Sequence, residues 1–191
     1  MNILESPKVA ALLGQLHREA DAQKSSVRTV VKEIREEQTS QEDFPSDWER
    51  LGDFYIPVTP EQGRFLYRIV REKKPQSVVE LGTSFGISTL YVAAALHDNQ
   101  CGKIVSAELI ARKAEKAMAN IRAAGLSDYV DIRTGDAFET LSSPEQPIDI
   151  LFPDAGPELN PRIIEMLRPH IRKDGLLLLK KRGEIIVLPV S

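Results

Sequence analysis

The fold is decided by one stretch of the sequence, Ser77-Val-Val-Glu-Leu-Gly-Thr-Ser-Phe-Gly-Ile-Ser88. Its apolar first half predicts a buried strand over Ser77–Leu81, and Gly82 and Gly86 let the backbone turn sharply into a helix over Ser88–Leu96. An acid followed by two glycines indicates a ligand site here because the pattern lies on a strand-to-helix turn, where a ligand can come close to the backbone. A tight turn without a ligand is the alternative interpretation.

The alternation of short apolar runs and helical patterns continues downstream. Predicted strands cover Lys103–Glu108, Tyr129–Thr134, Ile148–Pro153 and Leu176–Lys180, and predicted helices cover Ala111–Ala124 and Pro161–Ile171. Strands that alternate with helices form a mainly parallel sheet with right-handed crossovers. The fold class is therefore α/β, a Rossmann-like, doubly wound sheet whose ligand crevice lies beyond the carboxyl ends of its strands.

The part of the chain before this sheet is predicted to be helical. One helix starts at Ser6-Pro7, and a second amphipathic stretch covers Ser26–Glu37, before Pro45 marks a connector. A further helix is expected to begin after Thr59, because this residue is a good N-cap and Gln62 completes a capping box.

The composition is that of an ordinary globular chain, with 191 residues of which 42% are hydrophobic and 28% charged. One domain is expected over 1–191, made of an N-terminal helical segment, 1–58, and a core, 59–191. Cys101 is the only cysteine and favours a cytoplasmic location, because it has no partner for an internal disulfide. The longest apolar run, Leu90–Leu96, is far too short for a membrane span.

The charge balance argues against nucleic acid as a partner. The formal net charge is -3, and residues 1–50 carry 7 Lys and Arg against 10 Asp and Glu, so that the remainder is neutral. A protein that binds nucleic acid usually has a cationic surface, since its affinity comes largely from neutralised phosphates. A small-molecule ligand is the better expectation.

Acidic residues follow several predicted strands, at the edge of the sheet where a ligand would bind. Glu108 ends the second strand, where a carboxylate can accept both hydroxyls of a ribose. Asp136 could accept from an adenine amino group or cap a helix, and Asp154 follows the fourth strand. NAD enzymes and nucleoside-binding methyltransferases share the ribose acid, but the G-x-G-x-x-G pattern of the former fails at Ser84 and Ile87.

In their order along the chain, these motifs resemble those of the class I S-adenosylmethionine-dependent O-methyltransferases of the catechol and caffeoyl-CoA type. The resemblance covers about residues 48–180 and includes Tyr55–Gly63, which is similar to the family's segment before the helix that closes over the cofactor. It implies S-adenosylmethionine as cofactor, methyl transfer to a hydroxyl of a small molecule, and Asp154 as a catalytic residue. The cofactor-binding residues that it implies are Val58, Thr59, Glu80, Gly82, Ser84, Ser88, Glu108, Asp136, Ala137 and Asp154.

The sequence departs from this family at the metal-binding positions. Metal-dependent members hold a Mg²⁺-type ion with an Asp after strand four and an Asp-Asn pair after strand five. Here only Asp154 is present, the strand-five positions are Lys180-Lys181, and the family's catalytic Lys is replaced by Pro157. Ammonium groups repel a cation, so no metal site is expected. A lysine facing the crevice could instead supply positive charge to an anionic acceptor oxygen, and two solvated surface lysines are the alternative.

The C-terminal part is predicted to be shortened. Glu184–Val190 resembles the first strand of the family's terminal strand pair, as though the helix before it and the strand after it were missing. An uncovered sheet edge would favour a homodimer. Two alternative functions stay open: a non-catalytic scaffold that keeps the cofactor fold, and methylation of a modified base in transfer RNA.

Overall fold

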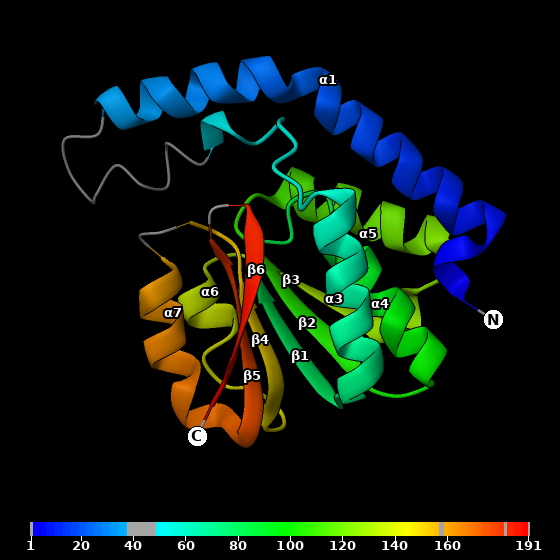
Figure 1. The fold of residues 1–191 in the computed structure, drawn as a ribbon. Coiled ribbons are helices and arrows are strands. Elements are labelled where there is room, and N and C mark those ends of the chain that lie inside the picture. The colour runs from blue at the N-terminus through cyan, green and yellow to red at the C-terminus, as the bar shows by residue number, and fades with distance from the viewer. Residues whose placement is uncertain (1, 38–48, 157–158, 182, 191) are drawn as a thin grey trace.

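A single mixed sheet forms the centre of the molecule (Figure 1). The computed structural model describes residues 2–37, 49–156, 159–181 and 183–190, and the predicted connector around Pro45 lies outside them. The strand order is β3-β2-β1-β4-β5-β6; β1 to β5 run parallel and β6 antiparallel to β5. The strands are β1 (Ser77–Leu81), β2 (Lys103–Glu108), β3 (Val130–Thr134), β4 (Ile148–Pro153), β5 (Ile171–Lys181) and β6 (Glu184–Pro189). The predicted α/β, Rossmann-like, mainly parallel sheet is confirmed.

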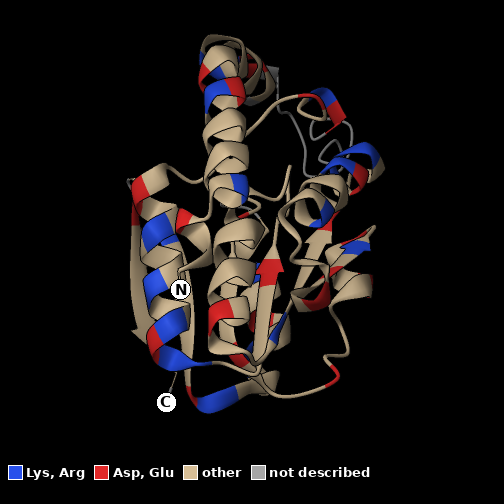
Figure 2. Ribbon diagram, turned by 90° about the vertical axis from the view of Figure 1, so that its right-hand side faces the viewer, with Lys and Arg blue, Asp and Glu red and all other residues tan. Residues whose placement is uncertain are grey.

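Helices cover both faces of this sheet, because successive strand residues point to opposite faces. Val78 packs in the larger buried cluster, with side chains from α1, α3, α4 and α5, whereas Val79 packs in the smaller cluster, beside α6 and α7. Figure 2 shows charges of both signs along the outer helices. The helices are α1 (Pro7–Glu37), α3 (Pro60–Lys73), α4 (Ile87–Asn99), α5 (Ala111–Ala124), α6 (Ala137–Thr140) and α7 (Asn160–Leu167). Of the described helices, none is long and apolar enough to cross a membrane.

Pro7–Glu37 form one continuous helix, α1, where the sequence pattern predicted two helical stretches. Ser25 and Ser26 resemble a second start, but no proline or glycine interrupts the chain there, and Thr29 Oγ1 donates back to the Ser25 carbonyl from within the helix. The first half of α1 buries apolar side chains such as Leu13 and Leu16 against the core. Figure 1 shows the helix crossing over the rest of the molecule.

Two boundaries near the C-terminus also differ from the prediction. The helix expected to reach Ile171 ends at Leu167 and continues as a 3-10 turn, η4 (Arg168–His170). Pro169 lies in that turn, and a proline has no N–H for a helical hydrogen bond. Strand β5 starts at Ile171, earlier than expected, because the pairing with β4 continues across an irregularity between Ile148 and Ile150. The predicted strand over Glu184–Val190 is confirmed as β6.

The start of α3 has the predicted capping box. Thr59 Oγ1 accepts from the Gln62 N–H at 3.2 Å, and Gln62 Oε1 accepts from the Thr59 N–H at 2.8 Å. The Gln62 amide nitrogen also donates to the Gly183 carbonyl at 2.7 Å, so the same side chain ties α3 to the turn before β6. The segment that precedes α3 is thereby fixed in place.

Thr59→Ala is expected to destabilise the protein by about 1 kcal/mol, because the first turn of α3 loses its side-chain acceptor. Urea unfolding followed by circular dichroism measures the change. Thr29→Ala, on the exposed surface of α1, is the matched control and should cost nothing, since alanine is the better helix former. Equal stability of Thr59→Ala and wild type would show that the capping box does not hold this turn.

Candidate functional site

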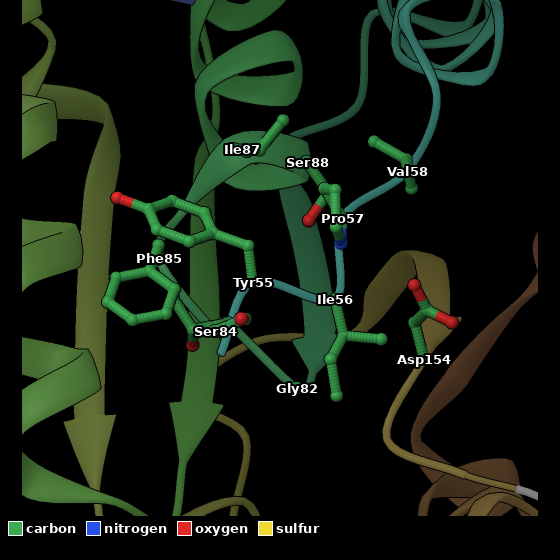
Figure 3. A pocket seen from close by; sticks show the side chains of 11 residues that line it. Tyr55, Ile56, Pro57, Val58, Gly82, Ser84, Phe85, Ile87, Ser88 and Asp154 are labelled. Atoms are coloured by element: carbon green, nitrogen blue, oxygen red, sulfur yellow. The ribbon is translucent and has the colours of Figure 1, made fainter. Parts of the chain in front are cut away.

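A small pocket, partly open to solvent, lies at the carboxyl ends of β1 and β4 (Figure 3). Three parts of the chain form it: the segment before α3, the turn between β1 and α4, and the residue after β4. This is the edge of the sheet at which the sequence places a ligand crevice. The lining residues are Tyr55, Ile56, Pro57, Val58, Gly82, Thr83, Ser84, Phe85, Ile87, Ser88 and Asp154.

The turn after β1 requires glycine at position 82. The φ angle of Gly82 is +93°, and a Cβ there would lie 2.9 Å from the carbonyl oxygen of Asp154. The Asp154 N–H donates to the Leu81 carbonyl, and the Gly82 and Thr83 N–H groups both donate to the Ala107 carbonyl. The ends of β1, β2 and β4 are therefore held close together, with no room for a side chain at the bend.

Glu80 lies at the end of β1 and is completely buried. Its Oε2 accepts from Thr89 Oγ1 and from Ser106 Oγ, both at 2.6 Å, and Ser106 in turn is 2.6 Å from Thr83 Oγ1. Among the described residues, Glu80 Oε1 has no hydrogen-bond partner. Burial raises the pKa of Glu80 to about 7, although the hydroxyl donors oppose the shift. The site therefore contains a buried carboxyl group with spare hydrogen-bonding capacity.

Glu108 ends β2 and anchors the neighbouring turns. Its Oε2 accepts from the Ser84 N–H at 2.7 Å and its Oε1 accepts from the Ile110 N–H at 3.0 Å. A carboxylate has about four lone-pair positions, so each oxygen can accept one further hydrogen bond. The side chain is thus oriented by the backbone while it keeps acceptors for a ligand.

Asp154, after β4, forms an ion pair with a lysine of β5. Lys180 Nζ lies 3.0 Å from Asp154 Oδ2, and the side chains are 28% and 16% exposed. Burial raises the pKa of Asp154, and the Lys180 ammonium group opposes that rise. Lys181 is exposed and pairs in register with Glu184 on β6. Because successive strand residues point to opposite faces, its side chain points away from that of Lys180. Of the two lysines singled out from the sequence, only Lys180 contacts the acid at the pocket.

The structure brings together half of the predicted cofactor-binding residues in one pocket. Its lining contains Val58, Gly82, Ser84, Ser88 and Asp154, and Glu108 is joined to it through Ser84. Glu80 lies beneath it, fully buried. These positions agree with the expected crevice, and the contacts with a cofactor remain a prediction.

Besides Glu80 and Glu108, three predicted residues are not among those that line the pocket. Thr59 caps α3, and exposed Asp136 caps α6 by accepting from the Phe138 N–H at 2.8 Å, which is the alternative that the sequence left open. Ala137 begins α6 and packs against the smaller buried cluster. Their short side chains are used for local structure, and their role toward an adenine ring or the methionine end stays a prediction.

Sequence reasoning missed an aromatic stack at the pocket. The rings of Tyr55 and Phe85 are stacked with centroids 4.0 Å apart, opposite Asp154 in Figure 3. The Tyr55 hydroxyl donates to Glu19 of α1 at 2.5 Å. Burial is the main reason why the pKa of Tyr55 is raised, and the Glu19 carboxylate raises it further. Lys113 Nζ lies 5.6 Å from the Phe85 ring centroid. No local pattern joins residues so distant in sequence.

The partners of Glu80 were also missed, although one signal was present. Ser106 is a polar residue in the middle of an otherwise buried parallel strand, and such a residue needs a buried hydrogen-bond partner. The register pairs Ser106 directly with Glu80. The presence of Ser106 inside a predicted core strand could therefore have predicted a buried hydrogen bond to the neighbouring strand.

The donor set does not fit the metal site of the family that the sequence resembles. The described part of the chain holds no group of three or more His, Cys, Asp or Glu residues that could bind a metal ion. Asp154, the remaining family ligand, is already paired with an ammonium group at 3.0 Å. A hard divalent cation needs several oxygen ligands, and here its place would adjoin a positive charge.

A doubly wound sheet with a glycine turn and acids at its strand ends defines the Rossmann-like α/β class, and comparison with known proteins gives the family. Residues 79–180, more than half of the chain, match the family described as "Methyltransferase domain". The chain belongs to this methyltransferase family.

Similar proteins of known name are O-methyltransferases. A catechol O-methyltransferase of Niastella koreensis is 38% identical over 104 residues, which are 52% of this chain and 46% of that protein. A catechol O-methyltransferase of Mycobacterium tuberculosis is 31% identical over 134 residues, 70% of this chain and 56% of that protein. The chain thus spans about half the length of these curated relatives. The crystal structure of an O-methyltransferase from Bacillus cereus in complex with SAH has a TM-score of 0.61 and 26% identity, over 77% of this chain and 70% of that one.

Proposed function

We propose that the protein is an S-adenosylmethionine-dependent O-methyltransferase that methylates a hydroxyl group of a small molecule. The names of its relatives and the SAH complex of a structural neighbour support this activity. The observation that carries it is the pocket at the glycine bend, where Gly82 meets Asp154 and where Glu108 orients the adjoining turn. A glycine lets a ligand approach the backbone closely, and Gly82 is part of the lining of this pocket.

The residues present fit such a cofactor. Glu80 Oε1, for which the described residues provide no hydrogen-bond partner, is a feature of a site built for a polar ligand. Glu108 would hold the ribose hydroxyls, Ser88 and Asp154 the amino acid end, and Val58 would cover it. When bound, the cofactor supplies a methyl group on a positively charged sulfur. Carboxyl groups around a partly desolvated crevice favour that charge.

The chain's own residues would position the acceptor and exclude water. Tyr55 and Phe85 form an apolar wall on one side of the pocket, and Ile56 and Pro57 complete it. Methyl transfer requires the acceptor oxygen in line with the methyl group at about 3 Å, so most of the rate gain comes from orientation. Asp154 lies at the opposite side of the pocket, where the family resemblance implies a catalytic residue.

The activity is tested with S-adenosylmethionine that carries a deuterated methyl group and catechol as the acceptor. Mass spectrometry is expected to find the labelled methyl ether of catechol. If S-adenosylhomocysteine binds and a panel of small hydroxylated acceptors gives no labelled product, the chain acts as a cofactor-binding scaffold. Labelled transfer RNA instead of labelled small molecules would establish the base-modifying alternative.

Glu108→Gln is expected to weaken S-adenosylhomocysteine binding about 10- to 100-fold, because a ribose hydroxyl loses a charged acceptor. Titration calorimetry measures the affinity, and Glu115→Gln, an exposed acid on α5, is the matched control. An unchanged affinity in Glu108→Gln would remove this residue from the cofactor site.

A further inference from the structure

The ion pair between Asp154 and Lys180 is the part of the site that the family resemblance does not explain. Strands β4 and β5 are parallel neighbours, so the residues at their ends meet at one edge of the sheet. Lys180 Nζ lies 3.0 Å from Asp154 Oδ2, and Asp154 lines the pocket. The resemblance expects oxygen ligands for a cation at this place. The chain provides a cation of its own.

The lysine keeps free donors in this position. An ammonium group has three N–H donors, and within the described residues that of Lys180 makes one hydrogen bond, to Asp154. Lys180 is not among the residues that line the pocket, but its side chain is 28% exposed and its ammonium group lies 3.0 Å from Asp154, which does line it. Asp154, the less exposed of the two side chains, holds the ammonium group in place through this charge-assisted hydrogen bond.

We propose that Lys180 contacts the acceptor oxygen and keeps it deprotonated, in place of a metal ion, and that the acceptor is therefore a phenol. This inference rests on the proposed methyltransferase function. Asp154 is the positioning residue for the ammonium group. The reaction would need no divalent metal.

The chemistry of the step sets the class of acceptor. The hydroxyl proton passes to water when the acceptor binds beside Lys180, the acceptor oxygen then forms its bond to the methyl carbon, and the carbon–sulfur bond breaks with its electron pair left on sulfur. An opposite charge at hydrogen-bond distance lowers a pKa by about 1 to 3 units. A phenol, with a pKa near about 10, becomes substantially ionised near neutral pH, whereas an aliphatic alcohol does not.

The test uses catechol as the probe and follows the ultraviolet absorption of its phenolate in the complex with S-adenosylhomocysteine. In the wild type, the pKa of bound catechol is expected to be about 1 to 3 units below that of free catechol. Lys180→Met should abolish this shift and reduce kcat at least about 100-fold, while the affinity for S-adenosylhomocysteine changes less than about threefold. Lys180→Arg, which keeps a cation, should restore part of both effects.

Lys181→Met, on the opposite face of β5, is the matched control and should behave as the wild type. Turnover should also be the same with a chelator and with added Mg²⁺. Three results would overturn the proposal: no phenolate shift in the wild type that binds S-adenosylhomocysteine, an unaltered shift in Lys180→Met, or turnover that a chelator abolishes. Failure of the wild type to bind S-adenosylhomocysteine would instead overturn the proposed function itself.

Discussion

Gly82→Val is expected to weaken S-adenosylhomocysteine binding at least about 100-fold, because the new side chain would occupy the bend against which we propose that the cofactor lies. A Cβ at this position meets the Asp154 carbonyl oxygen at 2.9 Å, and that oxygen belongs to backbone which cannot rotate away. The φ angle of +93° adds strain for any residue other than glycine. The expected loss of affinity has two causes: the valine side chain blocks the ligand, and its Cβ pushes the backbone after β4 away.

Titration calorimetry measures the affinity, and thermal unfolding followed by circular dichroism shows whether the variant is folded. Gly14→Ala is the matched control for adding a side chain to a glycine. Its Cβ would meet only the mobile end of Arg18 at 3.3 Å, within helix α1, so the protein should become slightly more stable and bind as before. A folded Gly82→Val protein that binds as tightly as the wild type would show that no ligand approaches this bend.

Glu80→Gln is expected to remove a pH dependence of folding stability of about 3 kcal/mol. The ordinary pKa of the carboxyl is 4.5, and burial raises it to about 7 in the folded protein. Between these values the folded state holds a proton that the unfolded state has released, so the wild type loses stability as the pH rises from 4.5 to 7. A glutamine is neutral throughout and has no such loss.

Urea unfolding at several pH values between 4 and 8 gives the two stability curves. The difference between Glu80→Gln and wild type should grow in favour of the variant as the pH rises. Glu115→Gln, whose side chain is exposed on α5, should follow the wild-type curve. Parallel curves for Glu80→Gln and wild type would mean that the pKa of Glu80 is the same in the folded and the unfolded protein.

Much of the fold was predictable because buried parallel strands are short apolar runs between turn residues. The bounds of β1, β2 and β4 match the prediction at both ends. The failures lie where packing overrides a local pattern. The amphipathic stretch Ser26–Glu37 was predicted as a second helical stretch but is part of α1, and the polar residues before Gly175 hid the first half of β5.

The candidate site was predictable in its backbone and not in its side-chain pairs. The strand-to-helix turn with Gly82 and the acids after several strands can be recognised from the local sequence. Because parallel strands end at one edge of the sheet, these residues are expected to lie together. The sequence could not tell which of Lys180 and Lys181 faces Asp154, because that choice depends on the register of β5. The stack of Tyr55 on Phe85 likewise depends on how the segment before α3 crosses the turn.

The most direct measurement is the crystal structure of the protein with S-adenosylhomocysteine. The account predicts the ligand across the ends of β1, β2 and β4, with its ribose hydroxyls on Glu108 and its amino acid end between Gly82 and Asp154. A ligand bound elsewhere, or a pocket still filled by protein side chains at saturating ligand, would contradict it.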